Sequence, residues 1–147
     1  MNSWYGDVEP AVAIGSTKSQ LTIGSSTYFL DGIPQTVITG AGTKAFSAVH
    51  TALAANQKCR ILVSVDSSQA IVTTQGPIVA DSVTDANTVL PAVPADTCPL
   101  GDVLIETTAA ETFVFQTTEL DANTTNASYR DFRWPDSGPD AISDAGA

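Results

Sequence analysis

The stretch Arg60-Ile61-Leu62-Val63-Ser64-Val65-Asp66 carries the clearest strand signal in the chain. Its β-branched residues pack well on a pleated surface and are stiff in helices. Ser67-Ser68 then forms a turn, and a second strand follows over Ala70-Ile71-Val72-Thr73-Thr74-Gln75 before Gly76-Pro77 ends it. This segment predicts an antiparallel hairpin and indicates a β-rich fold.

Short strands separated by turn residues continue on both sides of this hairpin. Asp31-Gly32 is a strong turn signal. We expect further strands at Gln20–Ile23, Thr27–Leu30, Gln35–Thr39, Leu100–Thr107, Thr112–Phe115 and Ala127–Phe132. Strands this short, with Gly-containing turns between them, predict an all-β fold with a sandwich or small-barrel body.

The stretch from Thr43 to Gln57 fits two structures. Phe46, Val49 and Leu53 recur at helical spacing, whereas the alternation around them also allows a strand. We favour a strand from the start of this stretch through about His50, followed by a loop, because the neighbouring segments are all β.

Three regions follow from the composition. Residues 1–16 show no clean period and predict an extended N-terminal arm, residues 17–128 form the body, and residues 129–147 form a C-terminal tail of mostly small and polar residues. Within the body, Asp81 to Pro99 is expected to be largely irregular, since Pro91, Pro94 and Pro99 cannot donate to a ladder. This irregular segment could cross between two sheets.

The charge is strongly acidic and unevenly distributed. The net charge is −10, and from Asp81 onward the only cations are Arg130 and Arg133. Direct binding of nucleic acid needs a surplus of Lys and Arg, so we expect none. No stretch reaches the length of a membrane helix, and Met1 to Asp7 lack the basic and apolar regions of a signal peptide. We therefore expect synthesis in a cytoplasm and no membrane partner. The excess of acidic residues either forms a solvated face or docks on a basic surface.

No catalytic or metal-binding pattern is visible. His50 is the only histidine and no nucleophile motif accompanies it, so a satisfied or exposed strand histidine is favoured over a general base in a small hydrolase. Cys59 and Cys98 predict two buried thiols rather than a bridge. A calcium site at Asp81, Asp85 and Asp96 matches no known loop spacing. We expect no enzyme activity, no catalytic residue, no metal and no cofactor.

Aromatic residues near both ends of the chain are the candidate contact residues. Trp4 and Tyr5 lie in the predicted arm, and Trp134 lies in the predicted tail. Aromatic side chains bury a large area at low entropy cost, so they are typical anchors in a neighbouring subunit's groove. Covering the chain's own core is the alternative.

The order of segments from about Gln20 to Ala122 resembles small structural proteins of tailed-bacteriophage virions, of the capsid decoration (cement) or head-fibre kind. The resemblance lies in the hairpin Ile61 to Gly76, then Leu90-Pro91-Ala92-Val93-Pro94-Ala95-Asp96, then Pro99-Leu100-Gly101-Asp102-Val103-Leu104-Ile105-Glu106, and last Phe113 with Thr117-Thr118-Glu119-Leu120-Asp121-Ala122.

This resemblance implies a β-sandwich or jelly-roll-like body, often a homotrimer, made in a host bacterial cytoplasm and placed on the outer capsid surface of a virion. It implies the major capsid protein as the partner and stabilisation of the shell by non-covalent contacts, with no catalytic residue to carry over. The alternative is a phage fibre or adhesin subunit that binds a host-surface receptor or glycan.

Overall fold

The structure is a computed structural model that describes residues 3–4, 13–14, 20–23, 27–35, 42–118, 120 and 125–131. Regular structure in these residues is almost entirely β, which confirms the all-β class, while the sandwich or jelly-roll arrangement stays a prediction. The strands are β1 (Ser3–Trp4), β2 (Ala13–Ile14), β3 (Gln20–Ile23), β4 (Tyr28–Leu30), β5 (Ile33–Gln35), β6 (Gly42–Ala45), β7 (Gln57–Asp66), β8 (Ile71–Gln75), β9 (Val79–Ala80), β10 (Thr97–Thr107) and β11 (Thr125–Asp131).

A five-stranded antiparallel sheet forms the centre of the molecule. Its order is β11-β10-β7-β8, and β9 pairs with the first residues of β7 on the same side as β8. The predicted hairpin is confirmed, with Val65 opposite Ile71 and Ile61 opposite Gln75. Residues Ile61 to Val65 are all buried, so both faces of β7 are covered. This double burial explains the unbroken apolar run in its sequence.

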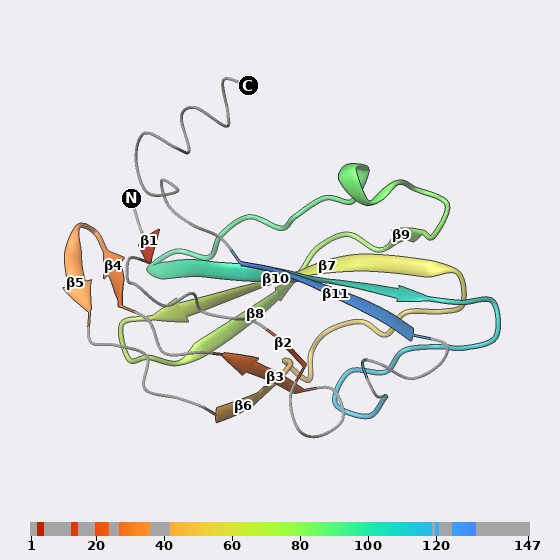
Figure 1. The fold of residues 1–147 in the computed structure, drawn as a ribbon, viewed down its shortest axis with the longest axis horizontal. Coiled ribbons are helices and arrows are strands. Elements are labelled where there is room, and N and C mark those ends of the chain that lie inside the picture. The colour runs from red at the N-terminus through yellow and green to blue at the C-terminus, as the bar shows by residue number, and fades with distance from the viewer. Residues whose placement is uncertain are drawn as a thin grey trace.

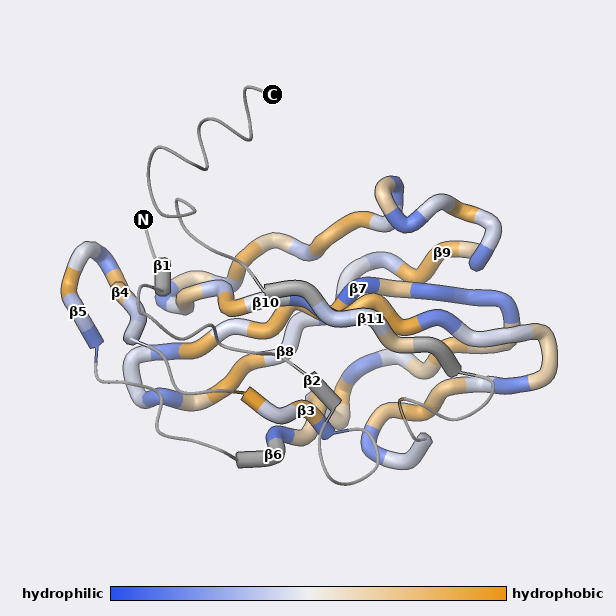
Figure 2. Tube along the Cα trace, viewed as in Figure 1, coloured by the Kyte–Doolittle hydropathy of each residue, from blue (hydrophilic) through white to orange (hydrophobic). Residues whose placement is uncertain are grey.

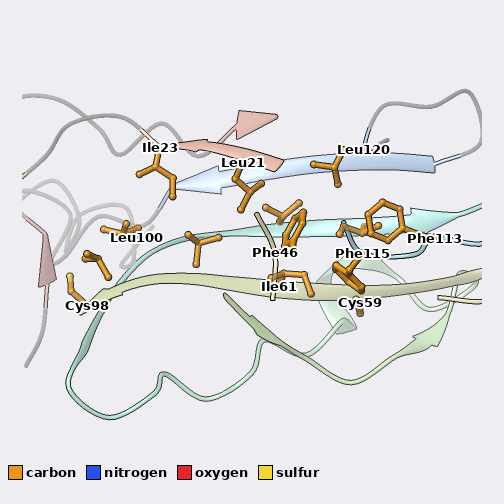
Figure 3. Close-up of a cluster of buried hydrophobic side chains, with 14 of the residues drawn as sticks. Leu21, Ile23, Phe46, Cys59, Ile61, Cys98, Leu100, Phe113, Phe115 and Leu120 are labelled. Atoms are coloured by element: carbon orange, nitrogen blue, oxygen red, sulfur yellow. The ribbon is translucent and has the colours of Figure 1, made fainter. Parts of the chain in front are cut away.

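Two small sheets lie against one face of the central sheet. Their orders are β1-β4-β5 and β2-β3-β6. Leu21 and Ile23 of β3 point toward the strands that carry Cys59 and Ile61 (Figure 3). Tyr28 of β4 is also fully buried, and its hydroxyl donates a 2.6 Å hydrogen bond to the Asp66 carbonyl at the end of β7. A single apolar core therefore joins all three sheets.

The opposite face of the central sheet is covered by the segment between β9 and β10, residues 81–96, which we call the strap. It leaves β9 on one side of β7 and enters β10 on the other side, so it crosses the sheet (Figure 1). Apart from a short 3₁₀ turn at Asp85–Asn87 it has no regular structure, as its prolines predict. The strap joins β9 and β10, which both pair with β7, so it crosses a single sheet and does not connect two sheets.

One predicted strand is shorter than expected, and another is wrong. The strand expected from Thr43 through about His50 is present as β6 but ends at Ala45, because the chain then turns, with the His50 amide donating to the Ser47 carbonyl and Val49 87% exposed. Thr112–Phe115 is reduced to one bridge between Leu53 and Phe113, followed by a turn. In both places the local alternation is satisfied by loop residues that pack on the core.

Strand boundaries shift in two further places. The hairpin at Asp31-Gly32 is confirmed, with both residues at positive φ, yet its second strand begins at Ile33 instead of Gln35. Residues 36–39 of the predicted strand lie outside the described residues. Strand β10 includes Pro99, which sequence reasoning placed in the irregular segment. The register shifts between Pro99 and Gly101, and such a bulge tolerates a residue without an N–H group.

The predicted arm and tail both contribute strands. Ser3–Trp4 of the arm pairs with β4, and Ala13–Ile14 pairs with β3. Strand β11 continues to Asp131, and Tyr129 packs against the core, so the first residues predicted as tail belong to the central sheet.

Candidate functional site

Two ion pairs lie on the face of the central sheet that the strap covers. Lys58 and Arg60 alternate along β7 and therefore point to the same, outer face. The Lys58 ammonium lies 3.0 Å from the carboxylate of Asp85 in the strap, and the Arg60 guanidinium lies 3.1 Å from the carboxylate of Asp102 in β10. Lys58 and Asp102 are buried, so these charges are inside the protein.

Arg60 also fastens the strap itself. Its guanidinium donates to the backbone carbonyls of Thr88 at 3.2 Å and Asp85 at 2.9 Å. The strap passes so close to the end of β8 that a Cβ on Gly76 would lie 2.6 Å from the Val89 carbonyl oxygen. In Figure 2 the first residues of β7, which carry these cations, are hydrophilic, and the later residues are hydrophobic. The strap is thus held by polar contacts at one end of β7.

These pairs leave a strongly acidic surface on the described part of the chain. Apart from Lys58 and Arg60, the only cation among the described side chains is Lys44. Among the described side chains, the carboxylates outside these two ion pairs are those of Asp31, Asp66, Asp81, Asp96, Glu106 and Glu111. A surface with this excess attracts a basic partner and repels another copy of itself.

Apolar side chains are exposed at three places. Val89 and Val93 of the strap are 55% and 47% exposed. Val49 and Val114 lie on two loops that are joined by the Leu53–Phe113 bridge, and Ile33 lies at the turn of the β4–β5 hairpin. Of these, the strap combines exposed valines with the carboxylates of Asp81 and Asp96, one at each of its ends.

His50 has a structural role in the loop that follows β6. Its Nε2 lies 2.9 Å from the Thr73 hydroxyl, and its ring meets the Phe115 ring edge-on at a centroid distance of 5.1 Å. Burial lowers the pKa of His50 below its ordinary value of 6.5. No carboxylate is hydrogen-bonded to it among the described residues, so this geometry lacks the third group that orients a catalytic base. The prediction of a satisfied histidine is confirmed, and its place in a strand is wrong.

Both thiols are free and buried, as predicted. Burial raises the pKa of Cys59 to about 11 and that of Cys98 to about 12. A thiol reacts as the thiolate, so neither is activated as a nucleophile.

The described residues hold no group of three or more side chains suited to a metal ion. Asp81, Asp85 and Asp96, the acids of the suggested calcium site, therefore do not form such a group. Asp85 pairs with Lys58, while the Asp81 amide donates to the Asn56 carbonyl. Nor is any helix in the described part long and apolar enough to cross a membrane.

The predicted contact residues fall mostly outside the described part. Trp4 lies in β1, where its backbone is opposite Tyr28, and Tyr5 and Trp134 lie outside the described residues. Sequence reasoning missed the buried ion pairs. Their signal is the alternation of Lys58 and Arg60 on a strand whose remaining residues are nearly all apolar.

The fold and this surface define an acidic all-β protein. No family model matches the chain, and no curated protein or solved structure matches it either.

Proposed function

We propose that this chain is a capsid decoration (cement) protein, which binds the outer shell of a tailed-bacteriophage capsid and stabilises it by non-covalent contacts. Its partner is the major capsid protein, and the strap is the surface that we assign to the contact. The proposal combines the resemblance of the segments from Gln20 to Ala122 with the surface chemistry of the folded chain.

The strongest support is the placement of the charges. The two cations of β7 are held in internal ion pairs, so the strap presents carboxylates and exposed valines without a neighbouring free cation from that strand. A surface of this kind fits a basic patch with an apolar centre, as protein interfaces combine a polar rim with an apolar core. Long-range attraction brings the partners together, and apolar burial then holds them.

The reactive groups support contact chemistry over catalysis. His50 is bonded to Thr73, and Cys59 and Cys98 are buried with raised pKa values. A protein that acts by adhesion needs a stable core and a shaped surface, and Cys59 and Cys98 are part of the core. Proteins of the decoration kind gain their effect from many symmetric copies, each of which adds a modest contact.

The test uses particles of the encoding phage from which this chain has been removed. The purified full-length chain is added back at low and high salt, and co-sedimentation and the temperature of genome release are measured. We expect binding that weakens with salt and restores heat resistance. Particles whose heat resistance is unchanged by removal and by add-back would contradict the proposal, and binding to host cells instead would favour the fibre or adhesin function.

A charge-matched pair of variants locates the surface. Asp81→Asn with Asp96→Asn removes two charges from the ends of the strap, and Asp31→Asn with Glu111→Gln removes two charges elsewhere. We expect the strap variant to bind capsids more weakly than the control variant. Equal binding by the two variants would show that the strap is not the contact surface.

A further inference from the structure

Strand β8 forms an edge of the central sheet with its outward backbone groups open. The Gly76 amide donates to the Arg60 carbonyl, and the Asp66 amide donates to the Ala70 carbonyl. In an antiparallel pair the bonded positions alternate, so Val72 and Thr74 bond to β7. Ile71, Thr73 and Gln75 therefore direct their N–H and C=O groups away from β7.

Nothing in the described part of the chain bonds to these outward groups. The loop after β6 contacts β8 through side chains only: the Ser47 amide donates to the Thr73 hydroxyl, and the Gln75 carboxamide exchanges two 2.8 Å bonds with the Thr51 backbone. The next outward position toward the C-terminus is Pro77, which has no N–H group, and Gln69 at the other end turns back to the Asp66 carbonyl. The open edge therefore spans three residues.

This edge differs from every other edge among the described strands. Edge strands are usually protected by charged residues, by proline or by short length. Strand β5 contains Pro34, β6 contains Lys44, and β11 contains Arg130 and Asp131. Strands β1, β2 and β9 have two residues each. Strand β8 has five residues, is rich in β-branched side chains and has none of these protections.

The sequence around β8 also suits contact between two copies of an acidic chain. Residues 67–80 are the longest run without a charged residue, in a chain whose net charge is −10. Two such chains repel each other over most of their surface, and the repulsion is least where both contact segments are neutral. This favours a second copy of the chain as the occupant, since a basic partner would gain nothing from a neutral edge.

We infer that β8 pairs antiparallel with β8 of a second copy about a two-fold axis at Thr73. Ile71 then lies opposite Gln75 of the second copy, and each outward pair exchanges two backbone hydrogen bonds. Asp66, the nearest charge on one side, is opposite Ala70, which lies three residues, or about 10 Å along the strand, from the axis. The two Asp66 residues are then more than about 20 Å apart, well beyond the screening length of about 8 Å at physiological salt.

This pairing closes two copies, whereas the resemblance implies a trimer, and it does not depend on capsid binding. The first test is sedimentation of the full-length chain over a concentration series, combined with amide hydrogen exchange by NMR. We expect a dimer in which the amides of Ile71, Thr73 and Gln75 become protected as the concentration rises. The amides of Val72 and Thr74 stay protected at every concentration, because they bond to β7.

Three variants complete the test. Thr74→Glu adds a charge beside the axis in both copies, and Ala92→Glu adds the same charge on the exposed strap as the control. We expect Thr74→Glu to raise the dimer dissociation constant at least tenfold and Ala92→Glu to change it less than threefold. Thr73→Pro, which removes the outward donor at the axis and no bond to β7, is expected to give a monomer. A wild-type chain that stays monomeric at millimolar concentration, or an oligomer whose 71, 73 and 75 amides exchange freely, overturns the inference.

Discussion

Removing the charge of Asp102 while Arg60 remains is expected to destabilise the fold strongly. The Asp102 side chain is 1% exposed and that of Arg60 is 12% exposed, with 3.1 Å between the two charged groups. Breaking a buried pair by removing one partner leaves the other charge desolvated and costs about 3–5 kcal/mol. Arg60 keeps two carbonyl acceptors in the strap, so we expect Asp102→Asn to lower the free energy of unfolding by about 3 kcal/mol, toward the low end of that range.

Replacing both Arg60 and Asp102 shows whether the loss of stability comes from an unpaired buried charge or only from the removal of a polar side chain. Arg60→Met with Asp102→Val fills similar space with apolar atoms and leaves no buried charge, so the combined loss is expected to be about 1 kcal/mol or less. Lys58→Met serves as a comparison, since the carboxylate of its partner Asp85 is 61% exposed and is solvated without it. That loss is expected to be below about 1 kcal/mol.

Urea unfolding followed by far-UV circular dichroism measures these free energies by linear extrapolation. The expected order of loss is Asp102→Asn first, with the double variant and Lys58→Met well below it. A loss under about 1 kcal/mol for Asp102→Asn would refute the reasoning that the pair is electrically buried. A double variant as unstable as the single variant would show that the strap depends on Arg60 for shape and not for charge.

Three further predictions concern single sites. Gly76→Ala places a Cβ 2.6 Å from a strap carbonyl and is expected to cost about 1–3 kcal/mol in the same unfolding assay, because neither backbone segment can move freely. Ser64→Ala is expected to raise the unfolding free energy by about 1 kcal/mol, since the fully buried Ser64 hydroxyl has no hydrogen-bond partner among the described residues; a measured loss would reveal a partner. His50 makes stability depend on pH, because its pKa in the folded chain is lowered from the ordinary value of 6.5. Just below pH 6.5 the unfolded chain therefore binds more protons than the folded chain. The stabilisation present above pH 6.5 is lost as the pH falls from 6.5 to the folded pKa. Unfolding measured across that range should show a slope that His50→Gln lacks, and equal slopes in both proteins would contradict it.

The strands that the sequence predicts best are those whose burial leaves a mark in composition. Strand β7 reads as an unbroken apolar run because the core covers one face and the strap covers the other. The Asp31-Gly32 turn is equally visible, since a two-residue hairpin requires positive φ and Gly adopts it without strain. In both cases the residues that show the sequence pattern are the same residues that are buried or that adopt the positive φ.

The errors arise where distant residues decide the structure. The loop after β6 has a strand-like alternation, yet Thr73 and Gln75 of β8 bind its backbone and hold it as a loop. Pro99 is tolerated because a bulge opposite β7 removes the need for its missing donor. Neither partner lies near in sequence, so no local pattern could reveal these structures.

The candidate surface was only partly predictable for the same reason. The acid excess is visible in composition, but a count of charges does not show which cations remain on the surface. The ion pair of Arg60 with Asp102 joins residues 42 apart, and that of Lys58 with Asp85 joins residues 27 apart. The contact roles of Trp4, Tyr5 and Trp134 stay predictions.

The strap and the β8 edge should respond to salt in opposite directions, because their attractions have different origins. Docking of the strap on a basic surface is driven by its carboxylates, so added salt screens the attraction and weakens binding. Pairing of two β8 edges is driven by backbone hydrogen bonds and is opposed by the repulsion of two chains of net charge −10, so added salt screens the repulsion and strengthens the dimer. A single salt titration that follows both dimer mass and capsid binding therefore separates the two surfaces. If the same copies use both surfaces, low salt favours single copies on the shell and high salt favours free dimers.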